Sequence, residues 1–227
     1  MTTPTTMRIL TSILLLSITY LGTQAQGISF SYLIPKNGYL SAPVSPFSIR
    51  GLGIGNIVGI ETGASLYNVP GLGMKDLDFQ ASEPLVGPHF AILVPADVFV
   101  KIPTGPLITK LFAGGFGWWN INTRPNSGNI DRALRTYEEW EVLNGNWTID
   151  DRIGYGWLAG IEFQLALSDQ LTLTTEASYL NGSSKTNISG SYTGGSSGTA
   201  LTTKQLNDDG AILLEGLEIS IGVIMNR

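Results

Sequence analysis

The chain has 227 residues, no cysteine, 28 glycines and a formal net charge of −5, and only 14% of its residues are charged. The lack of cysteine excludes a disulfide framework and a bacterial lipid anchor, and an acidic chain without a basic run does not fit nucleic-acid binding. Low charge combined with abundant glycine fits strands that face lipid on one side and a crowded polar interior on the other.

The amino terminus has the pattern of a secretory signal. Arg8 precedes the apolar run 9–21, and the short polar stretch 22–25 follows it. The run is about 13 residues long, whereas a helix that spans a membrane needs about 20. We therefore expect residues 1–25 to be a cleaved signal peptide and residues 26–227 to form a single β-domain.

Eight strand-like segments follow residue 26, and the connections between them alternate between short and long. The short connections are 55–56, 103–105 and 168–170, and the long ones are about 35–46, 69–87, 123–152 and 185–210. An up-and-down barrel in a membrane has tight turns at one end and long loops at the other. The rhythm therefore predicts an all-β, eight-stranded antiparallel transmembrane barrel, with short periplasmic turns and long extracellular loops.

Alternation within the strands supports this fold. In the segment 153–168, one phase is large and apolar throughout, and the opposite phase is small or polar. Side chains in a strand alternate between faces, so the two phases lie on opposite sides of the barrel wall. A barrel in water would need the reverse arrangement around its narrow interior. Six segments follow the same pattern: 28–34, 58–67, 90–102, 153–168, 171–179 and 216–225.

Two segments do not alternate cleanly. Residues 47–54 change phase partway, and residues 107–119 have apolar side chains in both phases. A β-bulge, often marked by glycine, would explain either case.

Charged residues collect in the small and polar phase, which we expect to face the lumen. They are Arg50, Glu61, Asp97, Lys101, Lys110, Glu162, Glu176 and Glu218. The interior of an eight-stranded barrel is only wide enough for side chains to fill, so these groups must pair with one another or hold water. A closed electrostatic core is favoured over a proton or ion path.

Aromatic residues near the ends of segments that lead into the long loops predict an aromatic girdle at the level of the lipid headgroups. They are Tyr32, Trp118, Trp119, Tyr155, Trp157 and Tyr179.

The long loops are the expected places for a specific function, because a rigid barrel presents them outward. Residues 131–141 fit a short helix capped at Asp131 or Asn129. Tyr137, Trp140 and Trp147 either stack on a sugar or a partner protein or pack within their own folded loop. The stretch 185–210, rich in Ser, Thr and Gly, is either a mobile tip or a hairpin that extends beyond the membrane.

This combination of strand phases and loop rhythm resembles the small outer-membrane barrels of Gram-negative bacteria, similar to OmpA-type and OmpX-type domains and other porin-family-like proteins. A signal that ends in Ala-Gln and frequent Gly-x-Gly are similar to features of the Bacteroidota. The resemblance implies export to the outer membrane. Barrels of this kind usually end in an aromatic assembly signal, and here Met225 and Arg227 stand in those positions.

No catalytic, metal-binding or cofactor-binding pattern is present, so we do not expect an enzyme. The single histidine, His89, begins a strand in the lumen phase, and we expect a loop residue to satisfy it. We expect a structural or interactive role: envelope integrity, surface adhesion, or an accessory subunit of an outer-membrane complex. Membrane lipid and a protein or glycan bound at the loops are the expected partners of a monomer or accessory subunit. A small-solute channel and a secreted lipocalin-like binder are the alternatives.

Overall fold

The computed structural model describes residues 26–36 and 42–225. The predicted signal peptide and Arg227 lie outside these residues. The described part contains one helix and ten strands, whose bounds are β1 Gln26–Pro35, β2 Val44–Ile54, β3 Val58–Val69, β4 Met74–Lys75, β5 His89–Thr104, β6 Leu107–Ile121, α2 Ser127–Tyr137, β7 Val142–Asp151, β8 Gly154–Ala166, β9 Leu171–Gly195 and β10 Thr202–Met225.

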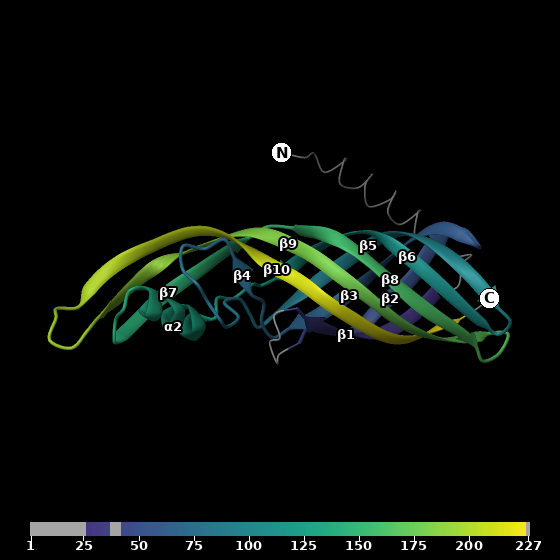
Figure 1. Ribbon diagram of the computed structural model, residues 1–227, viewed down its shortest axis with the longest axis horizontal. Coiled ribbons are helices and arrows are strands. Elements are labelled where there is room, and N and C mark those ends of the chain that lie inside the picture. The colour runs from purple at the N-terminus through teal and green to yellow at the C-terminus, as the bar shows by residue number, and fades with distance from the viewer. Residues whose placement is uncertain (1–25, 37–41, 226–227) are drawn as a thin grey trace, which may run out of the picture.

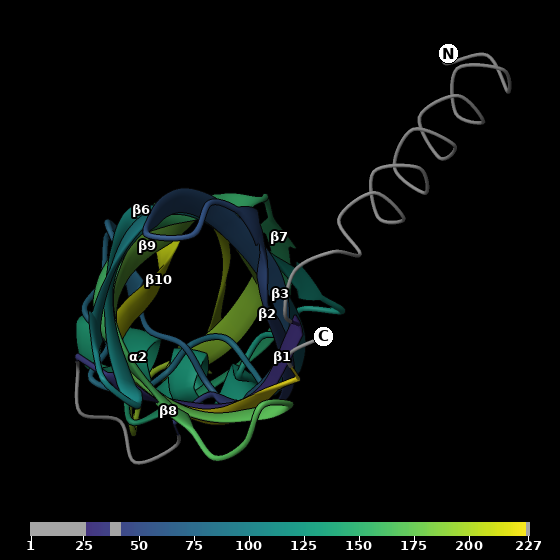
Figure 2. The ribbon, with the colours of Figure 1, turned by 90° about the vertical axis from the view of Figure 1, so that its right-hand side faces the viewer.

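Eight of these strands form a closed antiparallel ring, which confirms the predicted barrel. Neighbours in the ring are paired in the order β1, β2, β3, β5, β6, β8, β9 and β10, and β10 closes the ring by pairing with β1. Met225 of β10 pairs with Gln26 on one side and Leu171 on the other. Figure 2 shows this ring from one end.

The ends of the barrel differ as the loop rhythm predicts. The connections β2–β3, β5–β6 and β8–β9 lie at the end of the barrel where β10 ends (Figure 1). In the β5–β6 turn, Gly105 has a positive φ of 65°, a conformation that glycine adopts without strain. We refer to this end as the short-turn end.

At the other end, three of the long connections, 69–87, 123–152 and 185–210, fold into what we call the extension. Strands β9 and β10 continue beyond the ring as a long hairpin, and β7 pairs with residues 186–195 of β9. Strand β4 pairs with β10 at residues 211–212. The stretch 185–210 is therefore a hairpin, the second of the two structures that its composition allowed, and Figure 1 shows it beside α2 and β7.

Helix α2 begins earlier than predicted. Its N-cap is Asn126, whose side chain accepts a hydrogen bond from the Asn129 backbone amide, and the helix ends at Tyr137. The predicted caps at Asp131 and Asn129 are therefore wrong, because both residues lie inside the helix. Ile130 and Leu134 form the buried stripe of the helix. No helix in the described residues is long and apolar enough to cross a membrane.

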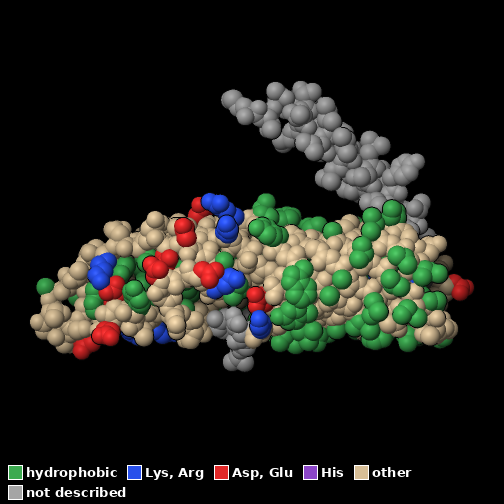
Figure 3. Space-filling model, turned by 45° about the horizontal axis from the view of Figure 1, so that its top comes forward, with side chains coloured by type: hydrophobic (Ala, Val, Ile, Leu, Met, Phe, Trp, Pro, Cys, Tyr) green, Lys and Arg blue, Asp and Glu red, His purple; other side chains and the backbone are tan. Residues whose placement is uncertain are grey.

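The outer surface of the ring is apolar. Figure 3 shows hydrophobic side chains gathered over the barrel and charged side chains over the other half of the molecule. Every strand of the ring contributes large exposed apolar side chains, among them Phe30, Phe47, Ile60, Val98, Leu111, Trp157, Leu171 and Ile221. We call this surface the apolar belt. A contiguous exposed apolar surface of this extent is typical of a membrane contact.

The two irregular segments have different explanations. Strand β2 contains the expected bulge: the register with β3 shifts between Ile49 and Leu52, where Gly51 has a positive φ of 77°. A second shift in β2 follows Val44. Strand β6, in contrast, pairs with β5 and β8 without a register break. A bulge in β6 is therefore wrong, and the apolar residues in its inward phase have another role, described below.

Candidate functional site

The cross-strand register places charged side chains in one row around the inside of the barrel. Lys101 pairs with Lys110, Lys110 with Glu162, and Glu162 with Glu176. Glu176 in turn pairs with Ser220. Five neighbouring strands thus carry polar side chains at the same level, because each of these positions has the inward phase.

Lys110 is the centre of the first cluster. Its Nζ lies 2.7 Å from Oε1 of Glu61 and 2.5 Å from Oε2 of Glu162. Gln164 donates from Nε2 to the other oxygen of Glu162 at 2.5 Å. The Lys110 ammonium also lies 5.5 Å from the centre of the Phe112 ring. One buried cation is therefore paired with carboxylates from two different strands.

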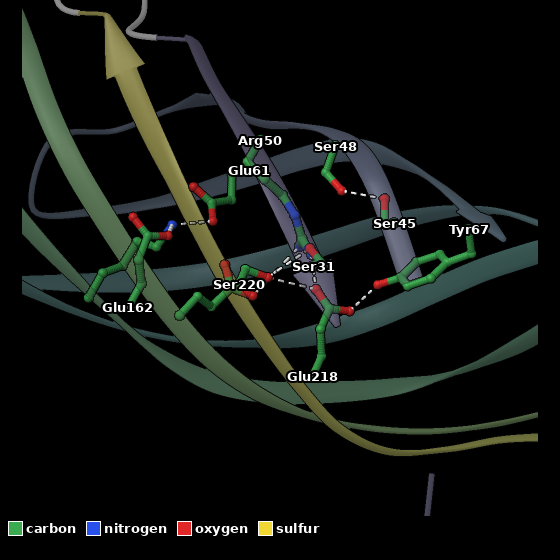
Figure 4. Close-up of polar contacts among 11 residues, drawn as sticks. Ser31, Ser45, Ser48, Arg50, Glu61, Tyr67, Glu162, Glu218 and Ser220 are labelled. Carbon is green, nitrogen blue, oxygen red and sulfur yellow. Dashed lines mark hydrogen bonds and ion pairs between the residues drawn. The ribbon is translucent and has the colours of Figure 1, made fainter. Parts of the chain in front are cut away.

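Arg50 is the centre of the second cluster (Figure 4). Its Nη2 lies 2.6 Å from Oε1 of Glu218, and its Nη1 lies 3.8 Å from Oε1 of Glu176, within ion-pair distance but too far for a hydrogen bond. Tyr67 donates its hydroxyl proton to Oε2 of Glu218. Ser220 donates to Oε1 of Glu218 at 3.1 Å. The Glu218 carboxylate, 1% exposed, is thus held by three side chains.

The structure places all eight predicted charges inside the barrel and brings six of them into the two clusters. The remaining two, Lys101 and Asp97, make no ion pair within the described residues. Lys101 is half-buried, and Asp97 pairs by register with Glu61 while its Oδ1 has no hydrogen-bond partner in the described part of the chain. The sequence analysis missed Tyr67, Gln164 and Ser220, although the inward phase of their strands already indicated them.

The clusters line a cavity of about 280 Å³ in the half of the barrel near the short turns. Its wall includes Gly27, Lys101, Thr172 and Ile224, which lie within a few residues of the strand ends at the short-turn end. A cavity of this size and polarity has room for several water molecules.

The other half of the interior is filled by apolar side chains, which we call the apolar plug. Seven strands and the 70–88 segment contribute to it. Its members include Leu33, Val69, Leu72, Val86, Leu93, Phe116, Trp118, Leu158, Leu180, Ile212 and Leu214. The members of the plug are 0–6% exposed and pack as one continuous apolar cluster.

Glycines make room for the aromatic members of the plug. A Cβ atom on Gly182 would lie 2.6 Å from Cζ of Phe116, and one on Gly160 would lie 2.6 Å from Cζ of Phe112. A Cβ atom on Gly154 would likewise overlap the Trp118 indole at its Nε1. The inward phase of β6 is therefore apolar because its rings pack against glycines of β8 and β9.

One of the predicted girdle residues is placed wrongly by the sequence analysis. Trp118 is fully buried in the plug, because its strand places it in the inward phase next to the outward Trp119. The other girdle residues lie on the outer surface of the barrel, and the rings of Trp157 and Tyr179 contact each other at 5.8 Å. These five are Tyr32, Trp119, Tyr155, Trp157 and Tyr179.

The aromatic residues of the extension mostly pack on one another. Trp147 is 5% exposed and donates from Nε1 to Oδ1 of Asp131 at 2.7 Å. The Tyr192 ring lies 5.6 Å from Trp147 and 5.8 Å from Trp140. A contact between Trp147 and a partner is therefore excluded in this conformation, and only Tyr137, 57% exposed, is a large exposed aromatic in the described part of the extension.

His89 lies at the rim of the barrel, and its one hydrogen-bond partner among the described residues is a strand residue instead of the expected loop residue, while its Nδ1 is buried without a partner. Its Nε2 lies 2.7 Å from Oδ1 of Asn120, whose amide donates to Asp151 at 2.7 Å. Thr123 donates to the same Asp151 oxygen. No group of three or more potential metal ligands occurs among the described residues.

Comparison with one solved structure, an outer membrane protein, supports the same architecture. The outer membrane protein OprG from Pseudomonas aeruginosa superposes with a TM-score of 0.52 and 12% identity, covering 89% of this chain and 96% of that one. A major outer membrane protein from Thermus thermophilus gives a TM-score of 0.38 and 10% identity, covering 87% and 98%. No family model matches the sequence, and no curated protein matches it. The similarity to OprG therefore concerns the fold.

Proposed function

We propose that this protein is an integral outer-membrane barrel of a Gram-negative bacterium with a closed interior and a structural or surface-interaction role. The observation that carries the proposal is the reversed arrangement of the wall: ion pairs lie inside, and large apolar side chains such as Phe30 and Trp157 lie outside. A soluble lipocalin-like binder would require a polar outer surface. The resemblance to small outer-membrane barrels supports the same location.

The apolar plug supports the proposal that the barrel is closed. The polar cavity near the short turns ends at the apolar plug, where Trp118, Leu93 and Leu180 are at most 1% exposed. Ions and polar solutes do not cross such a layer, because their desolvation is not compensated. A small-solute channel would need the plug to move.

The extension is the part of the protein that would meet partners. It is anchored to the barrel by the continuous strands β9 and β10 and has its own buried core around Ile130, Trp147 and Ile188. A folded, rigid projection presents a fixed surface, as adhesion or a place in a larger envelope complex requires. The partner is a protein or glycan, and the protein acts as a monomer or as an accessory subunit.

Three measurements test the proposal. The refolded protein should migrate faster on a gel before boiling than after it, and it should need detergent to stay in solution. In a planar bilayer, the wild type should give a flat current trace, and the variant Trp118→Ala with Leu93→Ala and Leu180→Ala should conduct if it still shows the gel shift.

A current through the wild type would favour the channel instead. A protein that stays soluble without detergent would contradict the membrane location. Trp119→Ala, on the outer face of the same strand, is the control and should leave the bilayer closed.

A further inference from the structure

Three basic residues lie side by side on the outside of the molecule, just beyond the barrel. Ala211 of β10 pairs with Lys75 of β4 on one side and with Lys185 of β9 on the other. The Arg152 backbone amide donates to the Lys185 carbonyl at 3.1 Å. Three chain segments thus bring Lys75, Lys185 and Arg152 into one row, with a small residue between the two lysines. We call this row the basic row.

The basic row is not neutralised within the protein. All three side chains are exposed, and none has a carboxylate oxygen within 4 Å in the part of the chain that the structure describes. Three other basic residues in the described part of the extension and rim do have such partners: Lys36 has Glu215, Arg132 has Glu83 and Lys204 has Glu138. The charges of the row are therefore available to an anion from outside.

The row borders a surface hollow of about 530 Å³. Three carboxylates, those of Asp76, Asp150 and Asp209, also line this hollow, and Asp209 accepts a hydrogen bond from Asn187. These three carboxylates do not form a metal-binding group within the described residues, so the part of the hollow that can bind an anion is the basic row.

The apolar belt ends at this row. Arg152 is followed directly by Ile153, and Tyr155 pairs with Ser183, which lines the hollow together with Lys185. Ile153 and Tyr155 are 69% and 72% exposed. Figure 3 shows charged side chains where the hydrophobic cover of the barrel ends. Tyrosine at the end of a membrane span lies at headgroup level, and basic residues next to it lie at the level of the lipid phosphates.

We propose that Lys75, Arg152 and Lys185 bind the phosphate groups of a membrane lipid, whose acyl chains lie along the apolar belt below Ile153. This inference rests on the proposed membrane location. A lipid phosphate fits better than free phosphate, because the apolar residues below the row would hold the acyl chains of the same molecule.

The test uses the full-length protein inserted into vesicles of phosphatidylcholine, with and without phosphatidic acid as the phosphate-monoester lipid. Native mass spectrometry then measures how much of each lipid stays bound. The wild type should retain phosphatidic acid preferentially. The triple variant Lys75→Gln, Arg152→Gln, Lys185→Gln should lose this preference by about a hundredfold, as expected for three basic residues near a membrane surface.

The control is Lys36→Gln with Lys204→Gln, which removes basic residues that already have carboxylate partners and should leave retention unchanged. Added inorganic phosphate should not displace the lipid; complete displacement would show a simple phosphate site and overturn the inference. Equal retention by the wild type and the triple variant would also overturn it.

The gel shift on boiling separates this inference from the proposed function. If the wild type inserts and shifts but has no preference for phosphatidic acid, only the lipid site is wrong. If it neither inserts nor shifts, both proposals are wrong.

Discussion

Arg50 and Glu218 are 168 positions apart in the sequence, yet Nη2 of the arginine lies 2.6 Å from Oε1 of the glutamate. Their strands, β2 and β10, are separated only by β1, on which Gly27 pairs with Arg50 and Leu33 pairs with Glu218, and the inward residues between these two levels are the small Ser29 and Ser31. A short side chain on the strand between them leaves the space in which the arginine reaches across.

Arg50→Met should destabilise the barrel by about 3 kcal/mol, because it leaves the buried carboxylates of Glu218 and Glu176 without their cation. Equilibrium unfolding in detergent micelles, followed by tryptophan fluorescence, measures the loss. Combining the change with Glu176→Gln and Glu218→Gln should recover part of it. A neutral effect of Arg50→Met alone would show that water in the cavity already screens these groups.

Gly182→Ala should cost about 1–3 kcal/mol, because the added methyl would overlap the Phe116 ring. Phe116→Leu in the same chain should relieve the overlap and restore part of the stability. Gly117→Ala is the matched control: its Cβ would have no contact closer than 4.0 Å. The unfolding midpoint in denaturant compares the three variants, and equal midpoints for Gly182→Ala and the control would refute the packing argument.

Trp147→Ala should loosen the extension and leave the barrel intact. It removes a buried ring and the hydrogen bond to Asp131, a loss of about 3–5 kcal/mol for a core tryptophan. Limited proteolysis should then cut within residues 123–152, while the gel shift of the barrel on boiling persists. Tyr137→Ala, at an exposed position, should leave the cleavage pattern as in the wild type. Loss of the gel shift in the tryptophan variant would mean that the two parts fold as one unit.

The extension should become less stable at acidic pH, because the Glu138 carboxylate that stabilises it becomes protonated. Burial alone would raise the pKa of this carboxyl, but hydrogen bonds from Lys204 and Tyr192 and the Lys204 charge lower it below its ordinary value of 4.5. A lowered folded-state pKa means that the stabilisation is present above the unfolded-state value and is lost as the pH falls through the folded-state value.

Hydrogen exchange of the β9–β10 hairpin should therefore speed up as the pH drops from about 4.5 downward, after correction for the intrinsic exchange rate. In Glu138→Gln, the corrected protection should be lower at neutral pH and should no longer change over this range. Identical pH profiles for the two proteins would show that other groups control the hairpin.

The strands of the ring could be predicted because each has a face in lipid. Strand β8 was expected at 153–168 and runs from Gly154 to Ala166. It was predictable because every second residue of a strand that faces lipid must be large and apolar. Strand β7 was not expected. Its residues alternate only weakly, and its partner strand, residues 186–195, is distant in the sequence and was interpreted only by composition.

The candidate site, too, could be predicted only in part from the sequence. The inward position of Lys110 or Glu162 follows from strand phase, but the choice of partners does not, because it depends on which strands become neighbours and at what register. Trp118 shows the limit of phase alone: it has the same phase as Lys110, but a bulge in this segment was expected, and only the unbroken register of β6 decides that Trp118 points inward.

The sequence by itself determined that this chain forms a barrel with an apolar outside and charges inside, because a period of two in six of the eight segments admits one assignment of faces. Only the tertiary structure decided that the polar cavity stops at an apolar plug, that the long connections fold into an extension, and that Lys75, Arg152 and Lys185 meet at the edge of the belt. These features depend on contacts between strands and loops far apart in the chain, which alternation within one strand does not encode.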